Sequence, residues 1–255
     1  MILRSLISAF AMYSRIPMPR IEWKEENRRY ALCFFPLIGA VIGVLLLGWQ
    51  RLCIYLNAGN MLFAAVCTVI PLAVTGGIHA DGFCDVSDAK ASCTDREKAL
   101  EIMKDPRIGA FALISFSAYL LIQTALFSEL SGNISAMTAA AAGFVLSRSL
   151  SGLAAVTFKC AKKTGTLQSF SEPAHKKMTI AALIITAALC LGIMLWADII
   201  CGAAGFAGAL ISFAYYRRFS YKRFGGITGD LEGYFLQICE ITTLAFITAA
   251  KLITA

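Results

Sequence analysis

Residues 31–50 read ALCFFPLIGAVIGVLLLGWQ, twenty residues without a charged side chain. An α-helix needs about 20 apolar residues to cross the hydrocarbon core of a bilayer. Five further uncharged runs of similar length follow, at residues 52–78, 108–128, 130–147, 178–197 and 199–216. Because only helices and closed barrels satisfy every backbone group in lipid, these runs predict a bundle of membrane-spanning helices.

The composition agrees with this class. Of the 255 residues, 58% are hydrophobic and 15% are charged, whereas a soluble domain carries about 25% charged residues. None of the nine cysteines forms a C-x-x-C pair, so neither a zinc site nor a disulfide framework is predicted. We expect an all-α polytopic membrane protein in which residues 1–255 form a single membrane-embedded domain. Its seven expected spans are 31–49, 55–78, 108–129, 133–157, 178–197, 199–216 and 233–253.

The N-terminal segment lacks the pattern of a removable signal peptide. Its apolar stretch runs only from Ser5 to Ser14, and Pro17 and Pro19 follow where a small-residue cleavage site would lie. We expect residues 1–16 to form a short interfacial helix.

Positive charges concentrate on one side of the predicted bundle. Twenty of the 23 lysines and arginines lie in the N-terminal segment or in the loops after the second, fourth and sixth spans. The other side carries only Arg51 and Lys251. By the positive-inside rule, the N-terminus and these loops face the cytoplasm, and the C-terminus faces outward. The net charge of +7 follows from this orientation and from contact with anionic lipid, so no nucleic-acid partner is predicted.

The densest group of reactive side chains, His79, Asp81, Asp85 and Asp88, follows the second span. If that span continues as a helix, the aspartates occur at i, i+4 and i+7 and lie within about 60° of one another. A divalent cation makes three like charges on one face tolerable, and oxygen ligands favour Mg²⁺, Mn²⁺ or Ca²⁺ over zinc. A solvated acidic loop is the alternative, although carboxylates beside lipid are usually functional.

A second group, Gly225, Gly226, Thr228, Gly229 and Asp230, precedes the seventh span. Glycines before a helix leave backbone N–H groups free to bind phosphate, and the helix dipole adds to the attraction. Asp230 could supply a carboxylate to a phosphate-bound metal. A flexible loop before a capped helix is the alternative. Because both groups are predicted on the same side, we favour a joint metal and phosphate site.

Arg148 and Glu240 are the charged residues expected inside spans. Arg148 lies about 16 Å from the cytoplasmic end of its helix and Glu240 about 15 Å from the start of its own. At this similar depth they could form a structural ion pair. Alternatively, they could form the floor of a polar cavity in which Arg148 contacts a phosphate or a carboxamide-rich substrate.

Residues 96–109 predict a cytoplasmic amphipathic helix that lies at the membrane interface and ends before Pro106. Its apolar side chains are expected to face lipid: Leu100, Ile102 and Met103. Lys104, Asp105 and Arg107 lie nearer the membrane, and the two basic side chains could bind phosphate groups.

Taken in order, these motifs resemble the cobalamin synthase family of adenosylcobinamide-GDP ribazoletransferases. The resemblance covers nearly the whole chain and includes Ser14 to Pro17, Gly76 to Asp88, Ile102 to Gly109, and Gly225 to Asp230 with Glu240. The chain departs from the family pattern at Ala80, Ala89 and Ala112. None of these departures removes a carboxylate, so only the local shape after Asp88 is placed in doubt.

The resemblance implies a multi-pass protein of the bacterial or archaeal inner membrane whose active site faces the cytoplasm. It implies the last joining step of cobalamin (vitamin B12) assembly. A ribose hydroxyl of α-ribazole, or of its 5′-phosphate, attacks adenosylcobinamide-GDP and releases GMP, with Mg²⁺ as the cofactor. Whether the protein forms a homo-oligomer or associates with other cobalamin-assembly enzymes is left open.

The resemblance also assigns roles to residues. The expected metal ligands are Asp81, Asp85, Asp88 and Asp230, and either Asp88 or His79 takes the proton of the hydroxyl. The expected substrate-binding residues are Arg15, Lys104, Asp105, Arg107, Arg148, Gly225, Gly226, Thr228, Gly229 and Glu240.

Two other functions fit the sequence less well. A membrane phosphotransferase acting on a CDP-linked lipid would use a similar aspartate-rich helix end, but its second half-motif, with an Arg soon after Asp-Gly, is absent. A transporter would place carboxylates near mid-membrane and polar residues on both faces. Here only Glu240 is deep and one face is nearly bare of charge, so transport is disfavoured.

Overall fold

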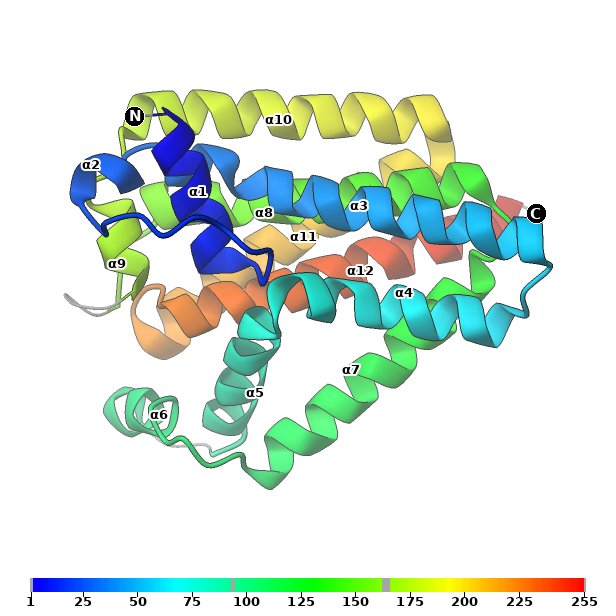
Figure 1. Cartoon of the computed structure of the whole chain (residues 1–255). Helices are drawn as coiled ribbons and strands as arrows, with labels where there is room; N and C mark the ends of the chain where they lie inside the picture. Colours follow the sequence, from blue (N-terminus) through cyan, green and yellow to red (C-terminus); the bar gives the residue numbers. More distant parts are fainter. Residues whose placement is uncertain (1, 93–94, 162–165, 255) are drawn as a thin grey trace.

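The computed structural model describes residues 2–92, 95–161 and 166–254, which form twelve helices and no β-strand (Figure 1). The helices of 16 residues or more are α3 (Ala31–Leu56), α4 (Asn60–Thr75), α7 (Ala110–Glu129), α8 (Ile134–Thr157), α10 (Lys176–Ala197), α11 (Ile199–Phe224) and α12 (Gly229–Thr254). The shorter ones are α1 (Ile2–Tyr13), α2 (Glu25–Arg28), α5 (Ile78–Ala91), α6 (Arg96–Ile102) and α9 (Thr166–Ser171).

The long helices confirm the predicted class. By length and hydropathy, six of the described helices can cross a membrane, namely α3, α7, α8, α10, α11 and α12. Helices α4 and α5 pass the same test only together, and they are bent by 97° at the break between them. The chain is therefore a multi-pass helical membrane protein, and the expected seven spans are reached if the bent pair counts as one.

Helix α8 is the centre of the bundle and packs against α3, α10, α11 and α12. Its sequence is rich in Ala, Gly and Ser, and small residues let membrane helices approach closely. On the facing helix, a Cβ added at Gly39 would overlap the backbone carbonyl of Phe144. The contact between α3 and α8 is thus a backbone-to-backbone contact that a side chain at position 39 would prevent.

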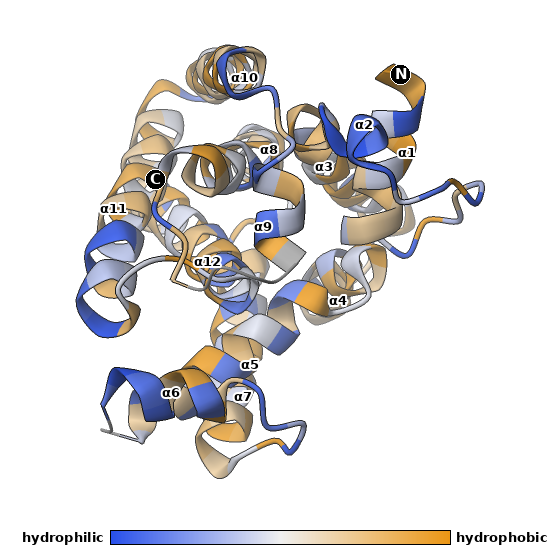
Figure 2. Ribbon diagram, turned by 90° about the vertical axis from the view of Figure 1, so that its left-hand side faces the viewer, coloured by the Kyte–Doolittle hydropathy of each residue, from blue (hydrophilic) through white to orange (hydrophobic). Residues whose placement is uncertain are grey.

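The two ends of the bundle differ in polarity. The N-terminus, α2, α6, α9 and the α11–α12 connection lie at one end, and the C-terminus lies at the other (Figure 1). Figure 2 looks onto the first of these ends, where hydrophilic segments gather on α2, α6 and the end of α11. This arrangement places the positively charged segments together, as the distribution of Lys and Arg predicts.

Several predicted boundaries were wrong, because helices continue beyond the apolar run that defines a span. Helix α3 extends to Leu56, where Asn57 ends it with a left-handed φ of 51°, so the second span begins at Asn60 and not at residue 55. Helix α11 continues to Phe224 and carries Arg217 and Arg218 within it. Helix α12 begins at Gly229, four residues before the predicted span.

The predicted amphipathic helix is shorter than expected and is oriented differently. Helix α6 ends at Ile102, and Met103 follows as its C-cap. Met103 is only 5% exposed, and Leu100 and Ile102 pack against the hydrophobic core, so the prediction that these side chains face lipid was wrong. The reason is tertiary, since α6 packs back onto α5 and α11.

Candidate active site

A sharp break between α4 and α5 positions the aspartates. Gly76 and Gly77 have φ values of +65° and +79°, which glycine adopts without steric cost. The second span therefore does not continue as the straight helix that the i, i+4, i+7 prediction assumed, and the aspartates lie on the separate helix α5. Arg15 stabilises the break, because its N–H donates to the Val74 carbonyl at 2.8 Å and its side chain occupies the space above Gly76.

Helix α5 packs directly on the start of α12. A Cβ added at Gly82 would lie 2.6 Å from the backbone oxygen of Asp230, so the two helices touch through their backbones. Burial, together with the negative charges of Asp81, Asp230 and Asp88, raises the pKa of Asp85 to about 7. These four carboxylates therefore form one electrostatically coupled group, as the two sequence motifs predicted.

Asp88 has a structural role within this group. Its Oδ2 accepts the N–H of Gly109 and its Oδ1 accepts the N–H of Ala112, both at 2.8 Å. These hydrogen bonds cap the first turn of α7 and turn the carboxylate toward that helix. Each oxygen retains one lone pair, since a carboxylate has about four acceptor positions.

In the described part of the chain, no three His, Cys, Asp or Glu side chains lie close enough together to hold a metal ion as they stand. The assignment of Asp81, Asp85, Asp88 and Asp230 as metal ligands therefore stays a prediction, which rests on the shared face of α5 and the approach of α12.

A cavity of about 450 Å³ lies beside this group, between α1, α3, α5, α8 and α12. Of the predicted site residues, the cavity wall contains His79, Asp81, Lys104, Thr228, Gly229 and Asp230. The His79 ring packs against two aromatic rings, with centroid distances of 6.4 Å to Tyr13 and 5.9 Å to Phe35. One wall of the cavity is thus aromatic and apolar, and the other carries acidic and basic groups.

The loop before α12 is arranged differently from the prediction. The N–H groups of Gly225 and Gly226 donate to the carbonyls of Tyr221 and Ser220, so they are not free for phosphate as expected. Gly226 instead permits a close approach to the loop after α8, where a Cβ would overlap the Lys159 carbonyl. The positive end of a helix dipole lies one turn later, at Gly229, where α12 begins, and there the Thr228 hydroxyl accepts the N–H of Leu231 at 3.2 Å.

The charges after α6 are separated by the fold. Lys104 lines the cavity. Arg107 instead pairs with Asp105 at 2.7 Å, with 86% of the Arg107 side chain exposed, and this exposed pair lies outside the described cavity wall. Of the two basic side chains predicted to bind phosphate, the structure brings Lys104 to the site.

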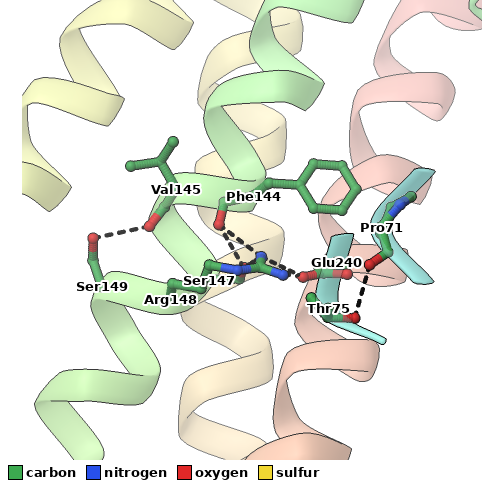
Figure 3. Close-up of polar contacts among 8 residues, drawn as sticks. All are labelled: Pro71, Thr75, Phe144, Val145, Ser147, Arg148, Ser149 and Glu240. Atoms are coloured by element: carbon green, nitrogen blue, oxygen red, sulfur yellow. Dashed lines mark hydrogen bonds and ion pairs between the residues drawn. The ribbon is translucent and has the colours of Figure 1, made fainter. Parts of the chain in front are cut away.

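Arg148 and Glu240 pair with each other, which was one of the two alternatives (Figure 3). The Arg148 Nη1 lies 2.6 Å from Oε1 of Glu240 and also donates to the Phe144 carbonyl at 2.9 Å. Both side chains are 1% exposed, and neither belongs to the described wall of the cavity. The structure therefore does not bring them to the site with the aspartates.

Comparison with known protein families gives a match that includes the residues of this site. The model of the cobalamin-5-phosphate synthase family matches residues 5–248, nearly the whole chain. The chain belongs to this family. It is therefore a transferase of the cobalamin-5-phosphate synthase family, as the resemblance predicted.

Curated relatives agree with this membership. The adenosylcobinamide-GDP ribazoletransferase of Lachnoclostridium phytofermentans is 45% identical over 94% of this chain and 91% of its own length. The protein of the same name from Clostridium perfringens strain SM101 is 32% identical, over 94% of this chain and 95% of its own. That of Geobacillus kaustophilus is 33% identical, over 90% and 89%. No solved structure gives a significant match to the chain.

Sequence reasoning missed several polar residues of the cavity in this cobalamin-5-phosphate synthase family member, among them Ser151 and Glu232. Ser151 of α8 and Glu232 of α12 both line it, and the Ser151 hydroxyl donates to Glu232 Oε2 at 2.5 Å. Glu232 lies one residue before the span predicted to begin at 233 and was not among the predicted site residues. The available signal was a carboxylate at the membrane end of a span, which is costly unless it is functional.

Proposed function

We propose that this transferase joins adenosylcobinamide-GDP to α-ribazole, or to its 5′-phosphate, and releases GMP. A ribose hydroxyl attacks the phosphorus atom attached to the cobinamide, and GMP leaves with the electrons of the broken P–O bond. Family membership and the names of the relatives support this reaction. Phosphoryl transfer of this kind needs charge neutralisation and positioning more than covalent catalysis.

One observation carries the proposal. Asp81 from α5 and Asp230 from α12 line the same cavity as Lys104, although the three residues come from separate parts of the chain. A diphosphate requires positive charge, and Lys104 supplies part of it. The start of α12 at Gly229 adds the positive end of the helix dipole.

Mg²⁺ suits the donor set of this site. Asp81, Asp85 and Asp230 offer carboxylate oxygens, and Asp88 retains lone pairs beside them. We propose that these residues hold Mg²⁺ together with the diphosphate. When bound, Mg²⁺ neutralises phosphate charge and lowers the energy of the developing leaving group.

We further propose that the protein lies in the inner membrane with this cavity facing the cytoplasm. The concentration of Lys and Arg at the end of the bundle that carries α2, α6 and α9 supports this orientation. The water-soluble nucleotide substrates would then reach the cavity from the compartment in which nucleotides are made.

The proposal is tested with the purified protein in lipid nanodiscs. We expect GMP and the joined corrinoid to appear only when adenosylcobinamide-GDP, ribazole or its 5′-phosphate, and Mg²⁺ are all present. EDTA should stop the reaction and added Mg²⁺ should restore it. A matched arm with a CDP-linked alcohol and an acceptor lipid tests the alternative phosphotransferase, and CMP release in that arm alone would overturn the proposal.

The metal ligands are tested separately. The variant carrying Asp81→Asn and Asp85→Asn keeps the size of both side chains and removes two charges. We expect it to insert normally and to lose ribazole transfer. A near wild-type rate at saturating Mg²⁺ would show that the carboxylates do not hold a required metal.

A further inference from the structure

We propose that a second pocket beside the cavity holds the guanine base of the nucleotide substrate, and that Glu172 selects guanine over adenine. This inference rests on the proposed function, because it assigns a place to one part of adenosylcobinamide-GDP. It starts from a group of polar side chains beside α9, at the end of the bundle that also carries α2 and α6, and the chemistry proposed above uses none of them.

The second pocket lies between the end of α8, α9 and the start of α10. Ala155, Cys160 and Gln168 line both this pocket and the cavity, so the two spaces adjoin. Its volume of about 290 Å³ is close to the lower limit for ligand sites, which suits one part of a ligand better than a whole nucleotide. The other residues of its described wall are Val156, Phe158, Ser171, Glu172 and Lys176.

A short parallel bridge fixes the second pocket relative to the aspartates. The N–H of Ala161 donates to the Ile227 carbonyl at 2.8 Å, and the N–H of Ile227 donates to the Lys159 carbonyl at 2.9 Å. Ile227 precedes Asp230 by three residues, which span at most about 11 Å. A ribose and a diphosphate bridge a distance of this order, so the phosphates of a nucleotide held in the second pocket reach toward Asp230.

The charges of the second pocket suit a neutral base better than a phosphate. Glu172 and Lys176 supply one carboxylate and one ammonium group to its wall, and in the described part of the chain no ion pair joins them. Their charges cancel, and the carboxylate repels an anion. Ala155, Val156 and Phe158 form an apolar side, which suits the flat ring of a base.

Gln168 supplies a buried acceptor to the wall of the second pocket. Its Nε2 donates to Oε2 of Glu172 at 3.3 Å, and this hydrogen bond orients both side chains. Its Oε1 is buried and has no hydrogen-bond partner among the described residues. Because an unsatisfied buried acceptor is costly, a ligand that brings an N–H donor to Gln168 and Glu172 is favoured.

Guanine has the donors that this wall needs. Its N1–H and its N2 amino group lie side by side on one edge, and its O6 accepts a hydrogen bond. Glu172 accepts N1–H and one N2–H, the second N2–H is left for Oε1 of Gln168, and Lys176 donates to O6. Adenine instead presents a lone pair at N1, which the Glu172 carboxylate repels. The wall therefore distinguishes the two purines.

The first experiment measures the Kd of GDP and of ADP by calorimetry, with the full chain in nanodiscs and Mg²⁺ present. GDP is the probe, because it is the nucleotide part of the proposed substrate. A bidentate pair discriminates between bases by about 10- to 100-fold, so we expect the wild type to bind GDP at least about 10-fold more tightly than ADP. IDP, which lacks the amino group, should bind with an affinity between the two. Equal affinity for GDP and ADP would overturn the proposal.

Glu172→Gln tests the carboxylate itself. A glutamine amide has one donor side and one acceptor side, so it pairs with both positions of adenine but with only one of the two donors of guanine. We expect the ratio of the ADP Kd to the GDP Kd to fall by about 10-fold or more. If Glu172 had a structural role alone, the variant would weaken both nucleotides equally, and that result would contradict the proposal.

Glu97→Gln on α6 is the matched control for this change. Glu97 is an exposed carboxylate at the same end of the bundle, and it lies outside the described walls of the cavity and of the second pocket. We expect it to leave the ratio of the two Kd values unchanged. A fall equal to that in Glu172→Gln would show that general surface charge sets the preference, and the second pocket would lose its role.

Two adjacent lysines at the start of α10 form another matched pair. Lys176 lines the second pocket, whereas Lys177 lies outside its described wall. Lys176→Met removes the donor to O6, and we expect it to weaken GDP binding by about three- to tenfold. Lys177→Met should weaken GDP binding by less than about twofold. Equal effects of the two changes would contradict the assignment of Lys176.

The failure of this inference differs from the failure of the proposed function. A wild type that releases GMP only with ribazole, but binds GDP and ADP equally, refutes the guanine assignment alone. A wild type that selects GDP but transfers nothing to ribazole refutes the proposed function. If guanine instead lies against the aromatic wall of the cavity, Glu172→Gln keeps the wild-type preference for GDP, which refutes the role of the second pocket.

Discussion

Arg148 of α8 and Glu240 of α12 form a buried ion pair, with 2.6 Å between Nη1 and Oε1 and only 1% of each side chain exposed. The pair lies where α8 and α12 meet. Arg148 Nη1 also donates to the Ser147 hydroxyl oxygen at 3.2 Å. Neither residue is in the described wall of the cavity, which indicates that the pair joins the helices and does not bind substrate.

We therefore predict that Arg148→Met lowers the free energy of unfolding by about 3–5 kcal/mol, because it leaves the Glu240 charge buried without its partner. Unfolding in mixed detergent micelles measures the change. The double variant with Glu240→Leu is the control and should recover most of the stability. A single variant as stable as the wild type would show that the pair does not join the helices.

Asp81 and Asp88 should respond differently to the same change. Asp88→Asn turns an amide donor toward the N–H groups of Gly109 or Ala112, so we expect about 1–3 kcal/mol of lost stability. Asp81→Asn removes a proposed metal ligand, so it should lose activity. Because it also relieves the repulsion on Asp85, it should not lose stability. Thermal unfolding and GMP release, measured on both variants, test the difference. Equal stability of the two would contradict the capping role of Asp88.

Gly82→Ala should disturb the site through the backbone. Its Cβ would lie 2.6 Å from the Asp230 oxygen and 2.9 Å from the Asp230 Cα, so α5 and α12 must move apart. Since a 1 Å misplacement can reduce a rate by about 100-fold, we expect a loss of that order in GMP release. Gly192→Ala on α10 is the matched control, because its Cβ would meet nothing within 4 Å. Similar rates for both variants would exclude a tight contact.

The orientation has its own test. A cytoplasm-sensitive reporter fused after Arg223 should be active, and the same reporter fused after Thr254 should be inactive, because the Lys-rich and Arg-rich segments stay inside. The two fusions differ by one crossing, α12, so each is the control for the other. The reverse pattern would contradict the proposed orientation.

Much of the fold was predictable from the chain alone. The predicted spans correspond to α3, α7, α8, α10, α11 and α12 to within a few residues at most ends. The break at Gly76–Gly77 was not predicted, because two adjacent glycines permit a bend without requiring one. Packing of Arg15 over Gly76 and of α5 on α12 selects the bent form.

The chemistry of the candidate site could be predicted from the sequence, but the full set of residues that form it could not. Carboxylates at 81, 85, 88 and 230 were found from spacing, and the structure brings them into one electrostatic group. Spacing could not show that Arg107 pairs with Asp105, or that the N–H groups of Gly225 and Gly226 are already used. These outcomes depend on local contacts that the residue types allow without specifying.

The sequence by itself determined that this protein is a multi-pass helical transferase of the cobalamin-5-phosphate synthase family. Apolar run length, charge distribution and ordered motifs are properties of the linear chain. Long apolar runs have few possible structures in lipid, because only helices and closed barrels satisfy every backbone group there. Only the tertiary structure decided which polar groups share the cavity. Ser151 and Glu232 meet because α8 and α12 pack side by side, and this contact between distant segments depends on packing that no local pattern records.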